Sequence, residues 1–179
     1  LNNLFQRNGL SINHAESNDF YGGSILAQAS TSQSEKSAEM LSILQQEKGV
    51  DVAGSVKSMK AKIISNKTRL LSLLVDLKAS GKRVIGIGAP MKASTLLNFY
   101  GITPDLVEYI AEVNELKVGT VVPGVRIPVI HEDRVFEDPP DYAILLSWNM
   151  ASHIIRNYRK MGYTGKFIMP VPVPEVIDD

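Results

Sequence analysis

Apolar residues follow two different patterns along the chain, and the change falls near residue 82. Over residues 51–79, apolar side chains recur at steps of three, four and seven, which is the spacing of one face of a long helix. From Lys82 onward, short apolar runs alternate with helical patterns, so strands connected by helices are predicted. This alternation favours a mostly parallel sheet that is covered by helices on both faces.

Five strands are predicted in the second pattern, at residues 83–88, 106–113, 127–130, 142–146 and 166–169. Helices are expected at residues 91–100 and 150–161. Right-handed crossovers favour the strand order 3-2-1-4-5, which places the first strand at the centre with Gly86 and Gly88 at its carboxyl end. We therefore predict an α/β fold, with a Rossmann-like three-layer αβα domain and a five-stranded, mainly parallel sheet over residues 82–179.

The first 30 residues predict a short helix followed by two strands. Leu1, Leu4 and Phe5 share a helical face, and strands are expected at residues 11–17 and 24–29. These elements are too few to bury a core of their own. We therefore interpret residues 1–30 as the C-terminal edge of an upstream domain, and the chain as a C-terminal piece of a longer protein.

Residues 31–81 predict a helical linker between these two parts. A helix is expected at residues 35–48, and Asp51 is placed to cap the next one. That second helix has an apolar seam at Val52, Val56, Met59, Ile63, Leu70, Leu74 and Leu77. Such a seam suits a coiled coil, and hence a homodimer through residues 51–79, or a long helix that lies on the domain and reaches toward a neighbour. We favour the second interpretation.

Composition narrows the function classes. Basic and acidic residues balance at 19 each, so nucleic acid is not an expected partner. No apolar run approaches the length that crosses a bilayer, so we expect no membrane partner either. The absence of cysteine excludes disulfides, thiolate zinc sites and cysteine nucleophiles, and it fits a cytoplasmic protein. The three histidines lack metal-binding spacing, so no metal site is expected.

Charge is unevenly distributed despite this balance. Residues 57–92 contain nine basic side chains against one acidic, a net charge of +8. Residues 105–141 contain three basic side chains against nine acidic, a net charge of −6. A solvated helix face beside an acidic sheet edge would explain this pattern, and so would a site for an anionic ligand.

The turn after the first strand is the clearest candidate site. It reads Gly86-Ile-Gly88-Ala89-Pro90-Met91-Lys92, with glycines that allow close backbone approach and a lysine in the first turn of a helix. Met91 stands where a dinucleotide fingerprint needs its third glycine, so an NAD site is disfavoured. Tight packing of strand on helix and binding of a phosphate or other polar group both remain open.

Two asparagines are expected near this turn. Asn149 ends the fourth strand, which neighbours the first strand in the expected order, and Asn98 lies further along the first helix. We expect Lys92, Asn98 and Asn149 to converge near residues 88–90, at the carboxyl edge where such sheets bind ligands. Asn149 as a structural cap, and Asn98 as a tie between the helix and the following loop, are the alternatives.

Several short motifs in the sequence are specific enough to resemble one family. Ordered blocks run from Gly86-x-Gly88-Ala89-x-x-Lys92-x-x-Thr95-Leu96-Leu97-Asn98 through Asn114-Glu115-x-Lys117-x-Gly119, Pro123-Gly124-x-x-Ile127-Pro128 and Leu145-Leu146-x-Trp148-Asn149 to Phe167-Ile168-x-Pro170. They resemble the C-terminal domain of the sugar C-methyltransferase family. Leu4-Phe5-x-x-x-Gly9-Leu10 and Gly22-Gly23-Ser24 are similar to the last elements of that family's methyltransferase domain.

The resemblance implies a parent enzyme that transfers a methyl group from S-adenosylmethionine to a carbon of a nucleotide-linked keto-deoxysugar. It places the S-adenosylmethionine site, a zinc-binding domain and the acid–base residues outside this chain, so the chain alone is expected to be inactive. The chain departs from the family at Tyr21, where histidine is usual, and at Ala93, where glycine is usual.

Within this chain, we expect a substrate-binding role and no catalytic residue. The candidate substrate-binding residues are Gly88, Ala89, Lys92, Asn98 and Asn149. The expected partners are the nucleotide-sugar and the upstream methyltransferase domain. A non-catalytic binding or dimerisation module, and a free-standing dinucleotide-binding regulator, are the competing hypotheses.

Overall fold

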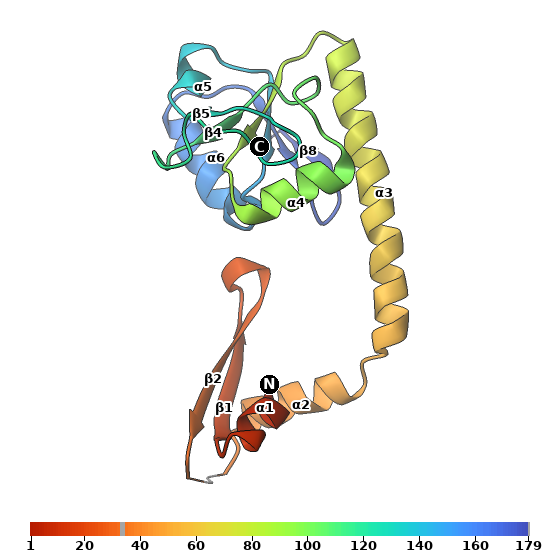
Figure 1. Ribbon diagram of the computed structural model, residues 1–179, viewed down its shortest axis with the longest axis vertical. Helices are drawn as coiled ribbons and strands as arrows, with labels where there is room; N and C mark the ends of the chain where they lie inside the picture. Colours follow the sequence, from red (N-terminus) through yellow and green to blue (C-terminus); the bar gives the residue numbers. More distant parts are fainter. Residues whose placement is uncertain (33–34, 179) are drawn as a thin grey trace. The chain divides into compact units, whose positions relative to one another are not determined.

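The computed structural model describes residues 1–32 and 35–178, and for Tyr21 the backbone alone (Figure 1). The chain divides into two compact units, Leu1–Met59 and Lys60–Asp179. The boundary falls within the long helix α3 (Val52–Ala79). The expected division into residues 1–30, 31–81 and 82–179 stays a prediction.

The first unit is built on a β-hairpin. Helix α1 (Asn2–Arg7) leads into strands β1 (Ser11–Asn18) and β2 (Ser24–Ser30), which pair antiparallel, and α2 (Ala38–Lys48) follows. The side chain of Ser37 caps α2 by accepting the N–H of Met40, so the helix begins three residues later than expected. Ile12, Ala15 and Met40 form the small core of this unit.

The second unit contains a mixed six-stranded sheet of order β5-β4-β3-β6-β7-β8. Its strands are β3 (Val84–Ile87), β4 (Ile110–Glu112), β5 (Val129–His131), β6 (Tyr142–Leu145), β7 (Lys166–Met169) and β8 (Glu175–Ile177). The first five are parallel and lie in the order expected from the sequence. The expected count of five strands is wrong, because β8 pairs antiparallel with β7 at the edge.

Alternate residues of the central strands face opposite layers of helices. Val84 packs in the cluster that contains α3 and α4 (Met91–Tyr100), whereas Ile85 and Ile87 pack in the cluster that contains α5 (Arg134–Glu137) and α6 (Ala151–Lys160). Figure 1 shows α4 and α6 on different sides of the strands. The parallel strands are therefore buried on both faces, as their near-continuous apolar composition requires.

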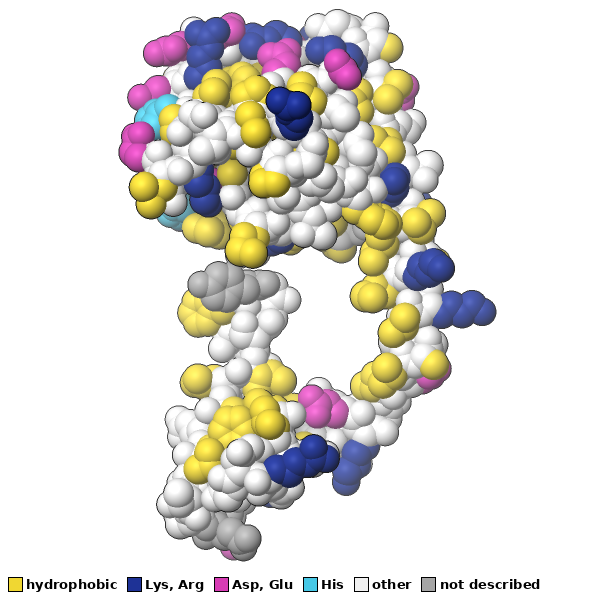
Figure 2. All heavy atoms as spheres, in the orientation of Figure 1, with side chains coloured by type: hydrophobic (Ala, Val, Ile, Leu, Met, Phe, Trp, Pro, Cys, Tyr) yellow, Lys and Arg dark blue, Asp and Glu magenta, His cyan; other side chains and the backbone are white. Residues whose placement is uncertain are grey.

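The apolar seam predicted on α3 is buried in only one half of the helix. Leu70 and Leu74 are fully buried in the core of the second unit. Toward the beginning of the helix, Val52, Val56 and Met59 are exposed, and Figure 2 shows hydrophobic side chains uncovered along this stretch. Among the described residues, none belongs to a helix with the length and apolar character that crossing a membrane demands.

Candidate functional site

The turn between β3 and α4 is fixed by two close backbone approaches. A Cβ at Gly86 would lie 2.6 Å from the Ile110 Cδ1 of β4 and 2.7 Å from the Leu146 Cδ1 that follows β6. A Cβ at Gly88 would lie 2.4 Å from the hydroxyl oxygen of Ser147, and Gly88 has a φ of +81°. These glycines let the strand sit between its two neighbours and turn into α4 at the carboxyl edge of the sheet.

Glu112 holds this turn from the end of β4. One carboxylate oxygen accepts the N–H of Ala89 at 2.8 Å, and the other accepts the N–H groups of Val113 at 3.0 Å and Asn114 at 3.1 Å. Burial disfavours the charged form, but these donors and the ammonium of Lys117 outweigh it, so the pKa of Glu112 is lowered. The buried carboxylate is therefore ionised and satisfied by backbone donors.

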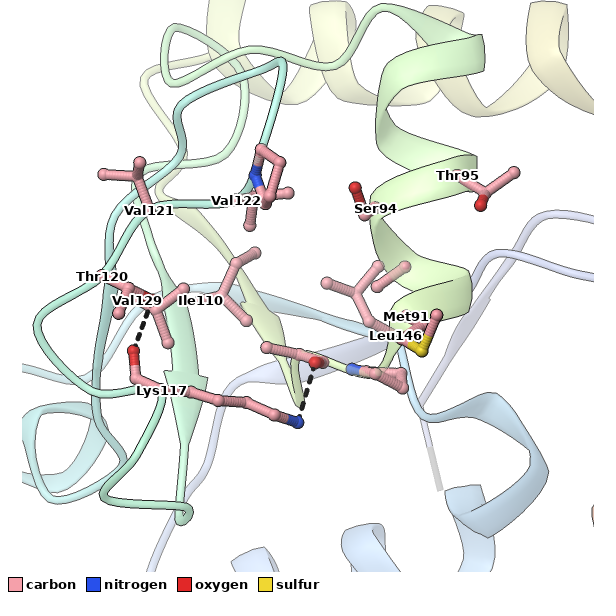
Figure 3. A pocket seen from close by; sticks show the side chains of 14 residues that line it. Met91, Ser94, Thr95, Ile110, Lys117, Thr120, Val121, Val122, Val129 and Leu146 are labelled. Carbon is pink, nitrogen blue, oxygen red and sulfur yellow. Dashed lines mark hydrogen bonds between the residues drawn. The ribbon is translucent and has the colours of Figure 1, made fainter.

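Lys117 holds the same turn from the loop after β4. Its ammonium donates to the carbonyl oxygen of Ala89 at 3.0 Å and lies 3.6 Å from the Glu112 carboxylate. Figure 3 shows the side chain extending toward the turn that precedes α4. Both backbone groups of Ala89 are thus held by one ion pair, which fixes the turn at the end of the central strand.

A cavity of about 630 Å³ opens beside this turn, and we call it the α4 cavity. Its walls come from the turn, α4, the loop over residues 117–123 and the ends of the central strands (Figure 3). Apolar side chains dominate, and Ser94, Thr95, Lys117 and Thr120 supply the polar groups. A concave, mostly apolar cavity with a few polar groups is typical of a small-molecule site.

Lys92 and Asn149 meet, as the sequence analysis expects. The ammonium of Lys92 donates to the side-chain oxygen of Asn149 and lies 4.2 Å from the centre of the Trp148 ring. Burial lowers the pKa of Lys92. Its side chain lines a separate cavity of about 420 Å³ between α3 and α4, together with apolar groups such as Ile63 and Phe99. Lys92 therefore already has two partners within its own unit.

Asn98 lies elsewhere on α4. Its amide donates to the carbonyl oxygens of Ser94 and Pro123, each at 2.8 Å. It ties the helix to the loop that follows β4, and a Cβ at Gly124 would lie 1.8 Å from its side-chain oxygen. The expected convergence of three residues is therefore wrong for Asn98, whose partners belong to this loop. The substrate-binding roles of Gly88, Ala89, Lys92, Asn98 and Asn149 stay predictions.

A second cavity, the α6 cavity, lies beside the same turn. It has a volume of about 400 Å³ and is lined by Gly88, Glu112, His153 and Asn157 among others. His153 and Asn157 are hydrogen-bonded at 3.0 Å, and the buried hydroxyl of Tyr158 donates to Glu132 at 3.1 Å. In residues 1–32 and 35–178, no cluster of three histidine, aspartate or glutamate side chains could hold a metal ion.

Sequence reasoning missed Glu112 and Lys117 as site residues. The signal was present, because Glu112 lies in the second predicted strand and Lys117 follows it, and the expected order puts that strand beside the first. Lys117 also belongs to one of the ordered blocks described above.

The second unit is an α/β domain with a mixed six-stranded sheet, and a glycine turn and a cavity lie beside its central strand β3. The chain belongs to the C-methyltransferase C-terminal domain family, whose model matches residues 19–172. It is 31% identical over 180 aligned positions to the C-methyltransferase NovU of Streptomyces niveus. That match covers 97% of this chain and 43% of the relative, so the chain spans less than half of that protein's length.

Proposed function

We propose that this chain is the substrate-binding C-terminal part of an S-adenosylmethionine-dependent C-methyltransferase that acts on a nucleotide-linked keto-deoxysugar. Family membership and the similarity to a C-methyltransferase support the transferase class. The observation that carries the substrate-binding role is the α4 cavity, which lies at the carboxyl edge of the sheet and is bordered by Lys117 and the start of α4.

The proposed reaction forms a carbon–carbon bond. S-adenosylmethionine, when bound in the parent, would supply the methyl group, and a base of the parent would remove the proton on the carbon next to the ketone so that this carbon can accept that group. We assign the base, the S-adenosylmethionine site and the structural zinc to parts of the parent outside this chain. The present chain would bind and orient the nucleotide-sugar and exclude water from one side of it.

The first unit has a role in the same proposal. The first unit has only three buried core residues, and it leaves Leu4 of α1 and Ile25 and Leu26 of β2 exposed. We interpret it as the edge of the upstream methyltransferase domain, which would cover these side chains.

Equilibrium titration of the full chain tests this function. A panel of nucleoside-diphosphate sugars with uridine and thymidine bases is titrated by calorimetry, and S-adenosylmethionine is titrated in parallel. We expect saturable binding of at least one nucleotide-sugar and no binding of S-adenosylmethionine. Binding of S-adenosylmethionine alone would contradict the assignment of its site to another part of the parent.

A dimerisation module is the second candidate, because Val52, Val56 and Met59 are exposed on α3. In that case residues 51–79 form a homodimer. Sedimentation equilibrium of the wild-type chain and of a Val56→Ser/Met59→Ser variant separates the cases. A dimer that the variant loses would support the module, and a monomeric wild-type chain would exclude it.

A further inference from the structure

We propose that the first half of α3 docks an amphipathic helix with acidic flanks, and that this helix belongs to a partner other than a second copy of the chain. The docking surface is a strip of exposed apolar side chains that we call the exposed seam, made of Val52, Val56, Met59 and Ile63. The inference does not rest on the proposed substrate-binding role, which uses other residues.

The first half of α3 lacks the packing that a helix of this kind needs. Residues 52–65 are exposed on every side of the helix. A helical segment of this length is marginal in water without packing, and Gly54 weakens it further. Leu70 and Leu74, by contrast, are fully buried in the second half of the same helix. A partner on the exposed seam would give the first half the support that the second half receives from its own unit.

The spacing of the exposed seam fits another helix. Its four residues follow steps of four, three and four, which is the alternation of the two core positions of a heptad. Val56 and Ile63 take one of these positions, and Val52 and Met59 take the other. A strip restricted to these two positions is the seam of a coiled coil, and it is narrower than the face with which a helix packs on a sheet or lies on a membrane.

The charges beside the exposed seam select an acidic partner. Residues 52–75 contain five basic side chains and no acidic one. Lys60 and Lys62 flank the seam on its two sides, and both are exposed (Figure 2). Two copies joined along this seam would therefore set cations against cations. A helix with glutamate or aspartate at its flanking positions would instead pair with these lysines.

The exposed seam leads into an apolar groove of the second unit. Ile63 ends the seam, and together with Leu96 and Phe99 of α4 it lines the cavity of about 420 Å³ between α3 and α4. Phe99 is 50% exposed, and the ammonium of Lys67 lies 5.2 Å from the centre of its ring. The apolar stripe of a partner helix would continue from the seam onto this groove, where its acidic side would meet a further cation.

Binding of synthetic helical peptides tests this inference. The probe peptide has three heptads, with isoleucine and leucine at the core positions and glutamate at both flanking positions, and the matched peptide has lysine at the flanking positions. Each carries fluorescein, and its anisotropy is followed as the full chain is added. We expect saturable binding of the acidic peptide and roughly tenfold weaker binding of the basic one. The Lys60→Glu/Lys62→Glu variant should reverse this preference.

A pair of matched variants tests the seam itself. Ile63→Asp places a carboxylate in the exposed seam, and Val75→Asp places the same group on another face of α3, where Val75 is 51% exposed. Ile63→Asp should raise the Kd of the acidic peptide roughly tenfold, and Val75→Asp should change it by less than about twofold. Circular dichroism compares the helix content of the two variants.

Four results would each overturn the inference. The first is no binding of the acidic peptide, and the second is equal binding of a scrambled acidic peptide, which would show charge attraction alone. The third is a wild-type dimer in sedimentation equilibrium that Val56→Ser/Met59→Ser loses, which would make a second copy the occupant. The fourth is binding to vesicles of phosphatidylglycerol and phosphatidylcholine without peptide binding, which would make a membrane the occupant. All four leave the proposed substrate-binding function standing.

Discussion

Gly88 is the residue on which the geometry of the turn depends most directly. Its φ of +81° lies in the left-handed region, and an added Cβ would stand 2.4 Å from the Ser147 hydroxyl oxygen. Gly101 has a similar φ of +75° with no heavy atom within 4 Å of an added Cβ. The two positions therefore share the backbone strain and differ in the steric contact.

Gly88→Ala should lower the free energy of unfolding by about 1–2 kcal/mol from strain, with a further loss from the contact with Ser147. Gly101→Ala should lose only the strain term, about 1–2 kcal/mol. Urea denaturation followed by circular dichroism measures both. Equal losses in the two variants would mean that Ser147 moves aside without cost.

Glu112 should make stability depend on pH in the acid range. Its pKa is lowered in the folded protein, so its contribution is complete above the ordinary glutamate pKa of about 4.3 and disappears as the pH falls through the lower folded value. We expect wild type to be more stable than Glu112→Gln at pH 7, with the difference shrinking below about pH 4.3. Denaturation midpoints at several pH values measure it.

Glu175→Gln is the control for this experiment, because Glu175 is exposed on β8. Because the residue is exposed, its replacement should change the free energy of unfolding at pH 7 by less than about 0.5 kcal/mol. If the Glu112→Gln difference stayed constant down to pH 2, the ionised form would not be what stabilises the turn.

At the scale of the element, the apolar side chains of α3 should contribute to the free energy of unfolding only where they are buried. Leu70→Ala and Leu74→Ala remove fully buried side chains and should each cost about 2–5 kcal/mol of unfolding free energy. Val75→Ala, on the same helix but 51% exposed, should cost less than about 0.5 kcal/mol. Thermal and urea denaturation of the three variants measure these costs, and similar values at Leu74 and Val75 would contradict the packing described here.

The elements also show what the sequence could predict. The strands and helices followed from the alternating apolar patterns, and right-handed crossovers predicted the order of the strands, which placed Gly86 and Gly88 on the central strand β3 and at its end. Strand β8, which follows the segment 170–174, was missed because a strand of three residues is too short to show an alternating pattern. The side chains of Lys92 and Asn98 were expected together, although six residues along a helix of 3.6 residues per turn place them far apart around its axis.

The pair of Glu112 and Lys117 was harder to find, because their meeting depends on three chain segments at once. Ala89 lies in the turn between β3 and α4, Glu112 ends β4, and Lys117 lies in the loop after β4. Hydrogen bonds between a side chain and a distant backbone group have no period along the sequence. Only the strand order brings these residues to one edge.

At the scale of the whole molecule, we predict that this chain alone transfers no methyl group. The chain corresponds to 43% of its C-methyltransferase relative, and we assign the methyl donor site to the remainder. Incubation with radiolabelled S-adenosylmethionine and a panel of nucleotide-sugars should leave no label in the sugar fraction. The parent enzyme, assayed alongside, shows that the panel holds a substrate, and labelled product from this chain alone would contradict the prediction.

The stacking of Lys92 on Trp148 has an optical consequence. Trp148 is the single tryptophan of the chain, and its indole lies under a cation at the carboxyl edge of the sheet. Tryptophan emission responds to nearby charge and to water, so all indole fluorescence of this protein originates beside the candidate site. A ligand that draws Lys92 away or shields the ring should change that emission. The protein thus contains its own spectroscopic reporter, and binding can be followed without attaching a dye.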